Sequence, residues 1–170
     1  MRNLYVLIGR SCSGKTSLIN ELISRHDVRI EPVSVFTNRK LRKDDPYYYF
    51  YSIPDKTVSG ILDFSITFDN GNWYGYQLRG QTESNIISFI DSDVAYQFIT
   101  RLLDRGHRIN PYIFYLGNSK INTFKCFFKR WMKGDIKFKD LIYRLKKHRN
   151  KGTESYEYIK QKIIYEEDKK

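Results

Sequence analysis

The sequence of 170 residues predicts one α/β domain built on a largely parallel sheet that is flanked by helices. Three observations support this prediction. Short apolar runs alternate with helical patterns, a glycine-rich loop joins the first apolar run to the first helix, and the polar stretch at about 37–80 is rich in turn signals. We therefore expect a core of about 1–36 and 81–170, interrupted by a small, mostly antiparallel insertion at about 37–80.

The chain opens with the pattern of a strand, a loop and a helix. Leu4–Ile8 is an unbroken apolar run, which is typical of a strand buried on both faces of a parallel sheet. A glycine loop follows, and Thr16–Arg25 then carries an apolar stripe at helical spacing. Ile30–Phe36 is expected to form another strand, whereas Thr37–Pro46 is basic and polar and is expected to be a loop.

The middle of the chain is predicted to consist of short strands. Tyr47–Tyr51 alternates weakly and favours one strand, and Ile61–Phe68 favours another. Asn70-Gly71-Asn72 is a strong turn signal. Trp73–Leu78 is therefore expected to return as the second arm of a hairpin.

The remainder of the chain alternates between strand and helix patterns again. Asn85–Ile90 and Tyr112–Leu116 are predicted to be buried strands, and Asp93–Arg105 is predicted to be the helix between them, with a glycine as its stop signal. Lys120–Met132 and Lys137–Asn150 are predicted to be helices.

Composition limits the classes of function. No stretch approaches the roughly 20 apolar residues that span a bilayer, so no membrane partner is expected. Cys12 and Cys126 lie far apart and fit no metal-binding spacing, which favours a reducing cytoplasm. The formal net charge of +11 suits nucleic acid, an anionic membrane face or anionic small substrates, and charge alone does not choose between them. Basic residues are concentrated at 125–151, and much of this run is expected to be a solvated helix face.

The loop between the first strand and the first helix matches the pattern G-x-x-x-x-G-K-[ST] at every fixed position. Its residues are Gly9, Arg10, Ser11, Cys12, Ser13, Gly14, Lys15 and Thr16. Glycines let such a backbone wrap closely around phosphates, and the helix that follows adds the positive end of its dipole. Lys15 is placed to reach the β- and γ-phosphates, and Thr16 to put its hydroxyl on Mg²⁺. The loop, together with Ser17, is therefore predicted to bind ATP.

Two acids follow the predicted strand Asn85–Ile90. Asp91 directly follows this strand, at the sheet edge where ligands of this architecture bind, and it is placed to hold Mg²⁺ partly through water. Asp93 lies two residues further on. Either acid could instead cap the helix that comes next.

Taken together, these motifs resemble the guanylate kinase family of P-loop nucleoside monophosphate kinases. Beyond the loop, the resemblance rests on four segments that occur in the family's order. They are Thr37-Asn38-Arg39-Lys40-Leu41-Arg42, Tyr48-Tyr49-Phe50, Gly71-Asn72-Trp73-Tyr74-Gly75 and Asp91-Ser92-Asp93. The resemblance covers about residues 4–145. It implies a P-loop NTPase-like parallel sheet, a monophosphate-binding insertion, and a helical lid at about 129–143.

The resemblance also implies a role for each matched residue. The acceptor monophosphate would be bound by guanidinium groups, tyrosine hydroxyls and carboxylates. These residues are Arg39, Arg42, Tyr48, Tyr74, Asp91 and Asp93. Arg130 and Arg144 would close over the transferring group and act with Lys15 in catalysis. Lys133 stands where the family usually has a further lid arginine.

The base pocket departs from the family pattern. The family places a serine at Val35, a glutamate near Ser65, and a serine or threonine at Tyr76. A site that recognises a base needs hydrogen-bond donors and acceptors, and valine offers none. Asp63 or Asp69 could supply the missing carboxylate. GMP therefore stays the preferred acceptor by resemblance alone.

The predicted function is ATP- and Mg²⁺-dependent phosphoryl transfer to GMP or dGMP in the cytoplasm, giving GDP and ADP. A kinase for another nucleoside monophosphate is the first alternative. A non-catalytic guanylate-kinase-like binding module is the second, and a nucleic-acid-binding protein that uses residues 125–151 is the third. Tyr156–Tyr165 is expected to stand in for the family's closing strand and helix.

Overall fold

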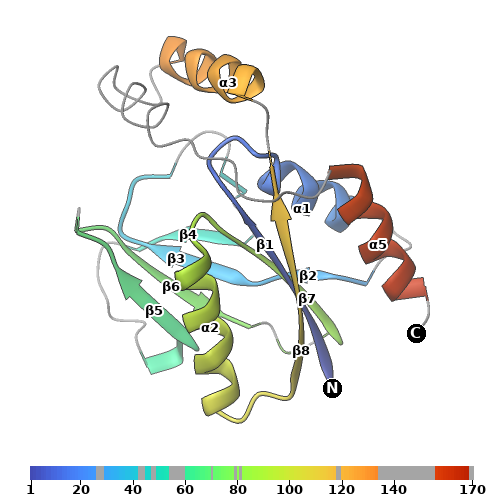
Figure 1. Ribbon diagram of the computed structural model, residues 1–170. Coiled ribbons are helices and arrows are strands. Elements are labelled where there is room, and N and C mark those ends of the chain that lie inside the picture. The colour runs from blue at the N-terminus through green and yellow to red at the C-terminus, as the bar shows by residue number, and fades with distance from the viewer. Residues whose placement is uncertain are drawn as a thin grey trace.

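The structure is a computed structural model of the 170-residue chain. It describes residues 1–25, 29–41, 45–46, 49–53, 60–69, 71–78, 80, 82–117, 120–133 and 156–168. In this part of the chain, two four-stranded sheets lie next to each other, with helices packed around the first (Figure 1).

The first sheet is entirely parallel. Its strand order is β2-β7-β1-β8, and every neighbouring pair runs in the same direction. The strands are β1 (Arg2–Gly9), β2 (Glu31–Pro32), β7 (Ser84–Phe89) and β8 (Ile109–Leu116). Every residue of Leu4–Ile8 is buried, as the unbroken apolar run predicts. Because the strands are parallel, the loops that follow β1 and β7 gather at one edge of the sheet.

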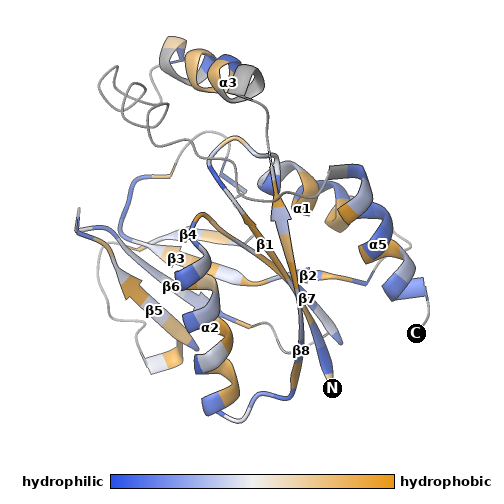
Figure 2. Ribbon diagram, viewed as in Figure 1, coloured by the Kyte–Doolittle hydropathy of each residue, from blue (hydrophilic) through white to orange (hydrophobic). Residues whose placement is uncertain are grey.

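Helices cover both faces of this sheet. α1 (Lys15–Ser24) and α5 (Tyr156–Asp168) lie on one face, and α2 (Ser92–Asp104) lies on the other (Figure 1). Apolar colouring is concentrated on the strands and on helix sides (Figure 2). The helices predicted near α1 and α2, and the strands predicted near β1, β7 and β8, are confirmed with shifts of a few residues at their ends. In the described part of the chain, no helix is long and apolar enough to cross a membrane.

The second sheet has the strand order β4-β3-β6-β5. The strands are β3 (Ser34–Thr37), β4 (Phe50–Ser52), β5 (Phe64–Thr67) and β6 (Trp73–Gln77). β3 and β4 are parallel, while the other two pairs are antiparallel. The predicted hairpin joins β5 to β6, and its turn places Gly71 at φ 78°, with the Gly71 N–H donating to Phe68 O at 2.9 Å.

One predicted strand is two strands. Ile30–Phe36 was expected to be continuous, but β2 pairs with β7 in the first sheet and β3 pairs with β6 in the second. Val33 lies between them, and its N–H still donates to Ile86 O at 2.9 Å. The chain therefore changes sheets within one predicted strand, and each sheet buries part of it, with Pro32 buried in β2 and Val35 buried in β3.

An aromatic cluster joins the second sheet to the first. The Tyr76 ring of β6 lies 5.9 Å from Phe64, 5.3 Å from Phe89 and 5.7 Å from Phe98, measured between ring centroids. Phe89 belongs to β7 and Phe98 to α2. Such contacts contribute about 0.5–1.5 kcal/mol per pair beyond the area they bury. They fix the position of β6 against the parallel sheet.

The C-terminal segment is helical. Tyr156–Tyr165 was expected to replace a closing strand and helix, and the structure has one helix there, α5. Ile159 and Ile163 are fully buried, and the Glu167 carboxylate accepts from Tyr5 Oη at 2.6 Å and from Ser84 Oγ at 2.8 Å. α5 is thereby attached to the first sheet.

The helix predicted at Lys120–Met132 is α3, with the same bounds (Figure 1). The predicted helix Lys137–Asn150 lies outside the described residues. α3 exposes Lys125, Lys129 and, directly after it, Lys133 to solvent. For these three lysines, the expectation of a solvated basic face is confirmed.

Candidate functional site: a glycine loop and an arginine-tyrosine pair

The glycine loop has a backbone that only small or strained residues can form. A Cβ at Gly9 would lie 2.6 Å from Leu116 O and 2.7 Å from Ser13 Oγ, so β8 and the loop leave no room for a side chain. Gly14 has φ 91°, in the left-handed region that glycine adopts without strain. Cys12 has φ 68°, which costs a residue with a Cβ about 1–2 kcal/mol. Strain of this kind is concentrated at functional sites.

The side chain of Lys15 lies inside this loop. Its Nζ donates to Gly9 O at 2.5 Å, to Arg10 O at 2.8 Å and to Ser13 Oγ at 3.3 Å. The residue is only 8% exposed. These three acceptors are neutral oxygens. A phosphate would offer acceptors of full negative charge, and hydrogen bonds to such groups are roughly twice as strong.

The first turn of α1 presents the positive end of the helix to the same loop. Gly14 is the N-cap residue and supplies no side-chain cap, and the first turn contains no acidic residue. Thr16 and Ser17 lie in this turn and are exposed. An anion at this helix end would be stabilised by the dipole.

Asp91 lies at the same edge of the sheet as the loop. Ile8 and Phe89 are paired in register, the loop follows Ile8, and Asp91 lies two residues after Phe89. Asp91 Oδ1 accepts from the Asp93 N–H at 2.8 Å, so Asp91, rather than Asp93, is the N-cap of α2. Both carboxylates are exposed. Among the described residues, no group of three or more His, Cys, Asp and Glu could hold a metal ion.

Arg39 follows the C-terminal end of β3 and is held by four partners. Asp45 accepts from both ends of the guanidinium, with Nη1 to Oδ2 at 2.7 Å and Nη2 to Oδ1 at 2.9 Å. Nε donates to the Tyr74 hydroxyl at 3.1 Å, and Nη1 donates to Lys40 O at 3.0 Å. The group also lies 4.8 Å from the centroid of the Phe50 ring. Burial alone would lower the pKa of Arg39, but the hydrogen bonds and charge of Asp45 outweigh it and raise the pKa.

A small hydrogen-bond frame attaches this arginine to the second sheet. Thr37 is fully buried, and its Oγ1 donates to Trp73 O at 2.8 Å and accepts from the Arg39 N–H at 3.2 Å. Asn38 Oδ1 accepts from the Trp73 N–H at 2.9 Å, and its Nδ2 donates to Gly71 O at 3.1 Å. The Thr37–Arg39 segment is therefore joined to the hairpin that carries Tyr74.

The three positions expected to differ at the base pocket lie in the second sheet. Val35 and Tyr76 face each other across β3 and β6 and are 7% and 6% exposed. Ser65 is exposed. Burial raises the pKa of Tyr76. Tyr76 is a core residue here.

Asp63 and Asp69 are the two candidates for a carboxylate that contacts the base. Asp63 Oδ2 accepts from the Leu78 N–H at 2.7 Å, and Oδ1 lies 3.1 Å from His107 Nε2. The carboxylate of Asp63 is therefore engaged in holding the end of β6 to the residues after α2. Asp69 is exposed in the hairpin turn.

Several predicted site residues lie outside the described residues, namely Arg42, Tyr48 and Arg144. Arg130 lies in α3, but its side chain is not among those described. The structure also shows two contacts of Arg39 that the sequence did not predict, the ion pair with Asp45 and the packing against the Phe50 ring. The available signal was a pair of acids, Asp44 and Asp45, in an otherwise basic loop.

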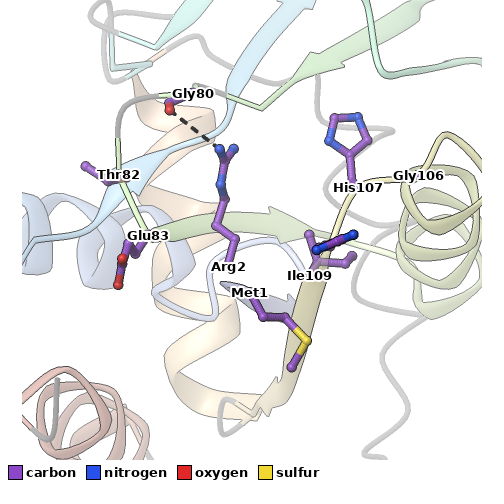
Figure 3. A pocket seen from close by; sticks show the side chains of 9 residues that line it. Met1, Arg2, Gly80, Thr82, Glu83, Gly106, His107 and Ile109 are labelled. Atoms are coloured by element: carbon purple, nitrogen blue, oxygen red, sulfur yellow. Dashed lines mark hydrogen bonds between the residues drawn. The ribbon is translucent and has the colours of Figure 1, made fainter.

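A separate hollow of about 460 Å³ lies at the opposite end of the strands (Figure 3). Met1, Arg2, Glu83, His107 and Arg108 are among the residues that line it. β1 and β8 begin there, whereas the glycine loop follows the end of β1. This hollow is therefore distinct from the candidate site.

Comparison with known proteins shows which fold the chain has. No protein-family model and no curated protein matches the sequence. Among solved structures, the chain matches the crystal structure of guanylate kinase from Anaplasma phagocytophilum with a TM-score of 0.52 and 15% sequence identity. The match covers 96% of this chain and 83% of that one. The parallel sheet flanked by helices, the glycine loop and this match together show that the chain has a guanylate-kinase-like α/β fold.

Proposed function

We propose that this chain is an ATP-dependent nucleoside monophosphate kinase that converts GMP or dGMP to the diphosphate. The observation that carries the proposal is the buried Lys15 ammonium, held by neutral oxygens inside the glycine loop at the start of α1. A buried ammonium group, a helix N-terminus without a side-chain cap, and a glycine backbone that phosphates can approach closely form a site for the phosphates of a nucleotide.

ATP would bind with its phosphates in the loop formed by residues 9–17. Lys15 would exchange its loop carbonyls for β- and γ-phosphate oxygens. A bound Mg²⁺ would supply positive charge that neutralises the phosphates. The exposed hydroxyl of Thr16 and the exposed carboxylate of Asp91 suit it, because Mg²⁺ prefers oxygen ligands and keeps several waters.

The acceptor phosphate would bind at the arginine-tyrosine pair, Arg39 and Tyr74. The fold supports this assignment because Arg39 lies two residues after β3, next to the sheet that interrupts the parallel core. Arg42 and Tyr48 would complete the grip on the phosphate, and Asp91 and Asp93 would border it. Since the nucleophile is an anionic phosphate, catalysis would come from positioning and charge neutralisation, and no general base is required.

A lid at about 129–143 would bring Arg130 and Arg144 over the transferring group and exclude water. Within one domain of 1–170, the acceptor insertion would occupy about 37–80. The cytoplasm would supply ATP.

A second candidate is a kinase for a different nucleoside monophosphate. Val35 and Tyr76 favour it, because both are buried in the second sheet and pair across β3 and β6. A core valine offers no hydrogen bond to guanine.

The test is a screen of ADP formation from ATP against each ribo- and deoxynucleoside monophosphate, with wild type beside Lys15→Ala. The proposal expects turnover with at least one monophosphate, GMP or dGMP first, and its loss in the variant. ATP binding without any turnover would favour a non-catalytic module. Salt-sensitive binding to polynucleotides, again without turnover, would favour nucleic acid as the partner.

A further inference from the structure

We propose that Asp45 is a positioning residue, which aims Arg39 and Tyr74 together at the phosphate of the acceptor. The inference rests on the proposed function and goes beyond it, because neither the sequence motifs nor the fold gives Asp45 a role. It starts from the way in which the donors of one guanidinium group are distributed.

A guanidinium has five N–H donors in a rigid plane. Asp45 takes the end of this plane, because its two oxygens bind Nη1 and Nη2 at 2.7 and 2.9 Å. The second N–H of Nη1 donates to Lys40 O at 3.0 Å, and Nε donates to the Tyr74 hydroxyl at 3.1 Å. The fifth N–H, the second one of Nη2, takes part in none of these bonds. It points along the same edge of the guanidinium as the Nε–H.

The Tyr74 hydroxyl completes a pair of donors on that side. Its oxygen accepts from Nε of Arg39, so its own proton is directed away from the guanidinium. The remaining Nη2 proton and the Tyr74 hydroxyl therefore lie along the same edge of the guanidinium, where both can donate to one ligand. Two adjacent donors, one of them charged, match two oxygens of a phosphate.

Several contacts make this arrangement rigid before any ligand arrives. The Arg39 and Asp45 side chains are 14% and 12% exposed, and the Phe50 ring covers the guanidinium at 4.8 Å. An arginine ordered in advance loses less side-chain entropy on binding. Asp45 binds the edge of the guanidinium formed by Nη1 and Nη2, and the edge formed by Nε and Nη2 is left for the phosphate. The guanidinium therefore lies between the negative charge of Asp45 and the ligand.

The test is the dissociation constant for the acceptor nucleotide, measured by calorimetry on the full chain. Asp45→Asn keeps the shape of the side chain and removes the charge and one of the two acceptors. We expect the dissociation constant for the monophosphate to rise on the order of tenfold, with that for ATP unchanged. Asp45→Glu, which keeps the charge, should recover part of the affinity.

Asp63→Asn is the matched control. Asp63 is also a partly buried aspartate next to the second sheet, but its hydrogen-bond partners are Leu78 N and His107 rather than Arg39. It should lower the thermal midpoint and leave the monophosphate dissociation constant unchanged. The Arg39 Nε–H resonance, followed by NMR, gives a second measurement, because it should broaden or shift in Asp45→Asn and stay fixed in Asp63→Asn.

Unchanged affinity in a folded Asp45→Asn variant would overturn the positioning role. Tighter binding would overturn it too, since it would show that Asp45 competes with the phosphate. If Asp45→Asn does not fold, Asp45→Glu with a wild-type affinity and an altered Nε–H resonance would overturn it as well. If wild type binds no monophosphate, the proposed function itself falls, which is a different result from wild type and variant binding equally.

Discussion

The ammonium nitrogen of Lys15 lies 2.5 Å from the carbonyl oxygen of Gly9, at the point where β1 ends. Lys15→Met keeps most of the side-chain length and removes the charge. We expect ATP affinity to fall about 10- to 100-fold, because charge-assisted hydrogen bonds to the phosphates are lost. Titration with a fluorescent ATP analogue measures this. Lys125→Met, at an exposed lysine of α3, is the control and should bind as wild type does. Equal affinity in Lys15→Met would contradict the loop assignment.

Gly9→Ala should damage the loop through sterics alone. The new Cβ would lie 2.6 Å from Leu116 O, which belongs to the backbone of β8 and has little freedom to move. We expect a loss of about 1–3 kcal/mol in the free energy of unfolding, together with weaker ATP binding. Gly60→Ala, where no atom lies within 4 Å of the new Cβ, should stay within about 0.5 kcal/mol of wild type. Urea unfolding of both variants measures this difference in the free energy of unfolding. A Gly9→Ala variant as stable as wild type would contradict the close packing of Gly9 against Leu116.

Substitutions at Asp91 separate its two roles. Asp91→Asn keeps an N-cap side chain for α2 and removes the charge, whereas Asp91→Ala removes both. Only the alanine variant should lose about 1 kcal/mol of stability. Both should need more Mg²⁺ for half-maximal turnover, if Asp91 holds the ion through water. A magnesium titration of the asparagine variant that superimposes on wild type would leave Asp91 with the capping role alone.

Tyr76 is expected to act through packing. Tyr76→Phe keeps the ring between Phe64, Phe89 and Phe98, so it should change stability by less than about 1.5 kcal/mol and leave the order of preferred acceptors unchanged. Tyr76→Ala should lower stability by about 3–5 kcal/mol, because it opens a cavity in the aromatic cluster. Thermal unfolding and the monophosphate screen test these expectations. A switch of acceptor in Tyr76→Phe would show that the hydroxyl contacts the base.

Tyr5 should make the protein sensitive to alkaline pH. Burial, reinforced by the hydrogen bond to Glu167, raises the pKa of Tyr5 above its ordinary value. The unfolded chain releases this proton near pH 10, while the folded protein keeps it. The stabilisation is therefore fully present below about pH 10 and is lost as the pH rises further.

Tyr5→Phe isolates this effect. It should cost about 1–3 kcal/mol at neutral pH, because the hydrogen bonds to Glu167 and from Asn3 are both lost. Its thermal midpoint should fall less steeply than that of wild type between about pH 9 and pH 11. Tyr76 also has a raised pKa and is present in both proteins, so only the difference in slope is informative. Parallel slopes would show that Tyr5 does not control the alkaline transition.

Local patterns were sufficient to predict most of the fold. The buried run Leu4–Ile8 predicts a central strand and the turn at Gly71 predicts a hairpin, and the structure has both. Ile30–Phe36 shows where local patterns stop. A strand pattern does not indicate which sheet the strand joins, and the break at Val33 depends on pairing with β7 and β6, which come much later in the chain.

The site divides in the same way. The loop residues could be found from their spacing, because phosphate binding demands glycines and a lysine in fixed order. The Arg39–Asp45 pair has no such spacing rule, since both residues lie in an irregular loop, where side-chain direction follows no period. Tyr76 was assigned to a base pocket because of its place in a motif, whereas its burial depends on Phe89 and Phe98 from other elements.

The most direct test of the central claim follows the transferred phosphorus atom by ³¹P NMR. The full chain is mixed with Mg²⁺, ATP and GMP, and then with each other monophosphate in turn. A kinase predicts that the γ-phosphorus signal of ATP and the phosphorus signal of the monophosphate fall together, while the signals of ADP and of a second nucleoside diphosphate grow and inorganic phosphate does not form. The same change should be absent in Lys15→Met. Formation of ADP and inorganic phosphate with the monophosphate signal unchanged, or no change with any monophosphate, would contradict the account.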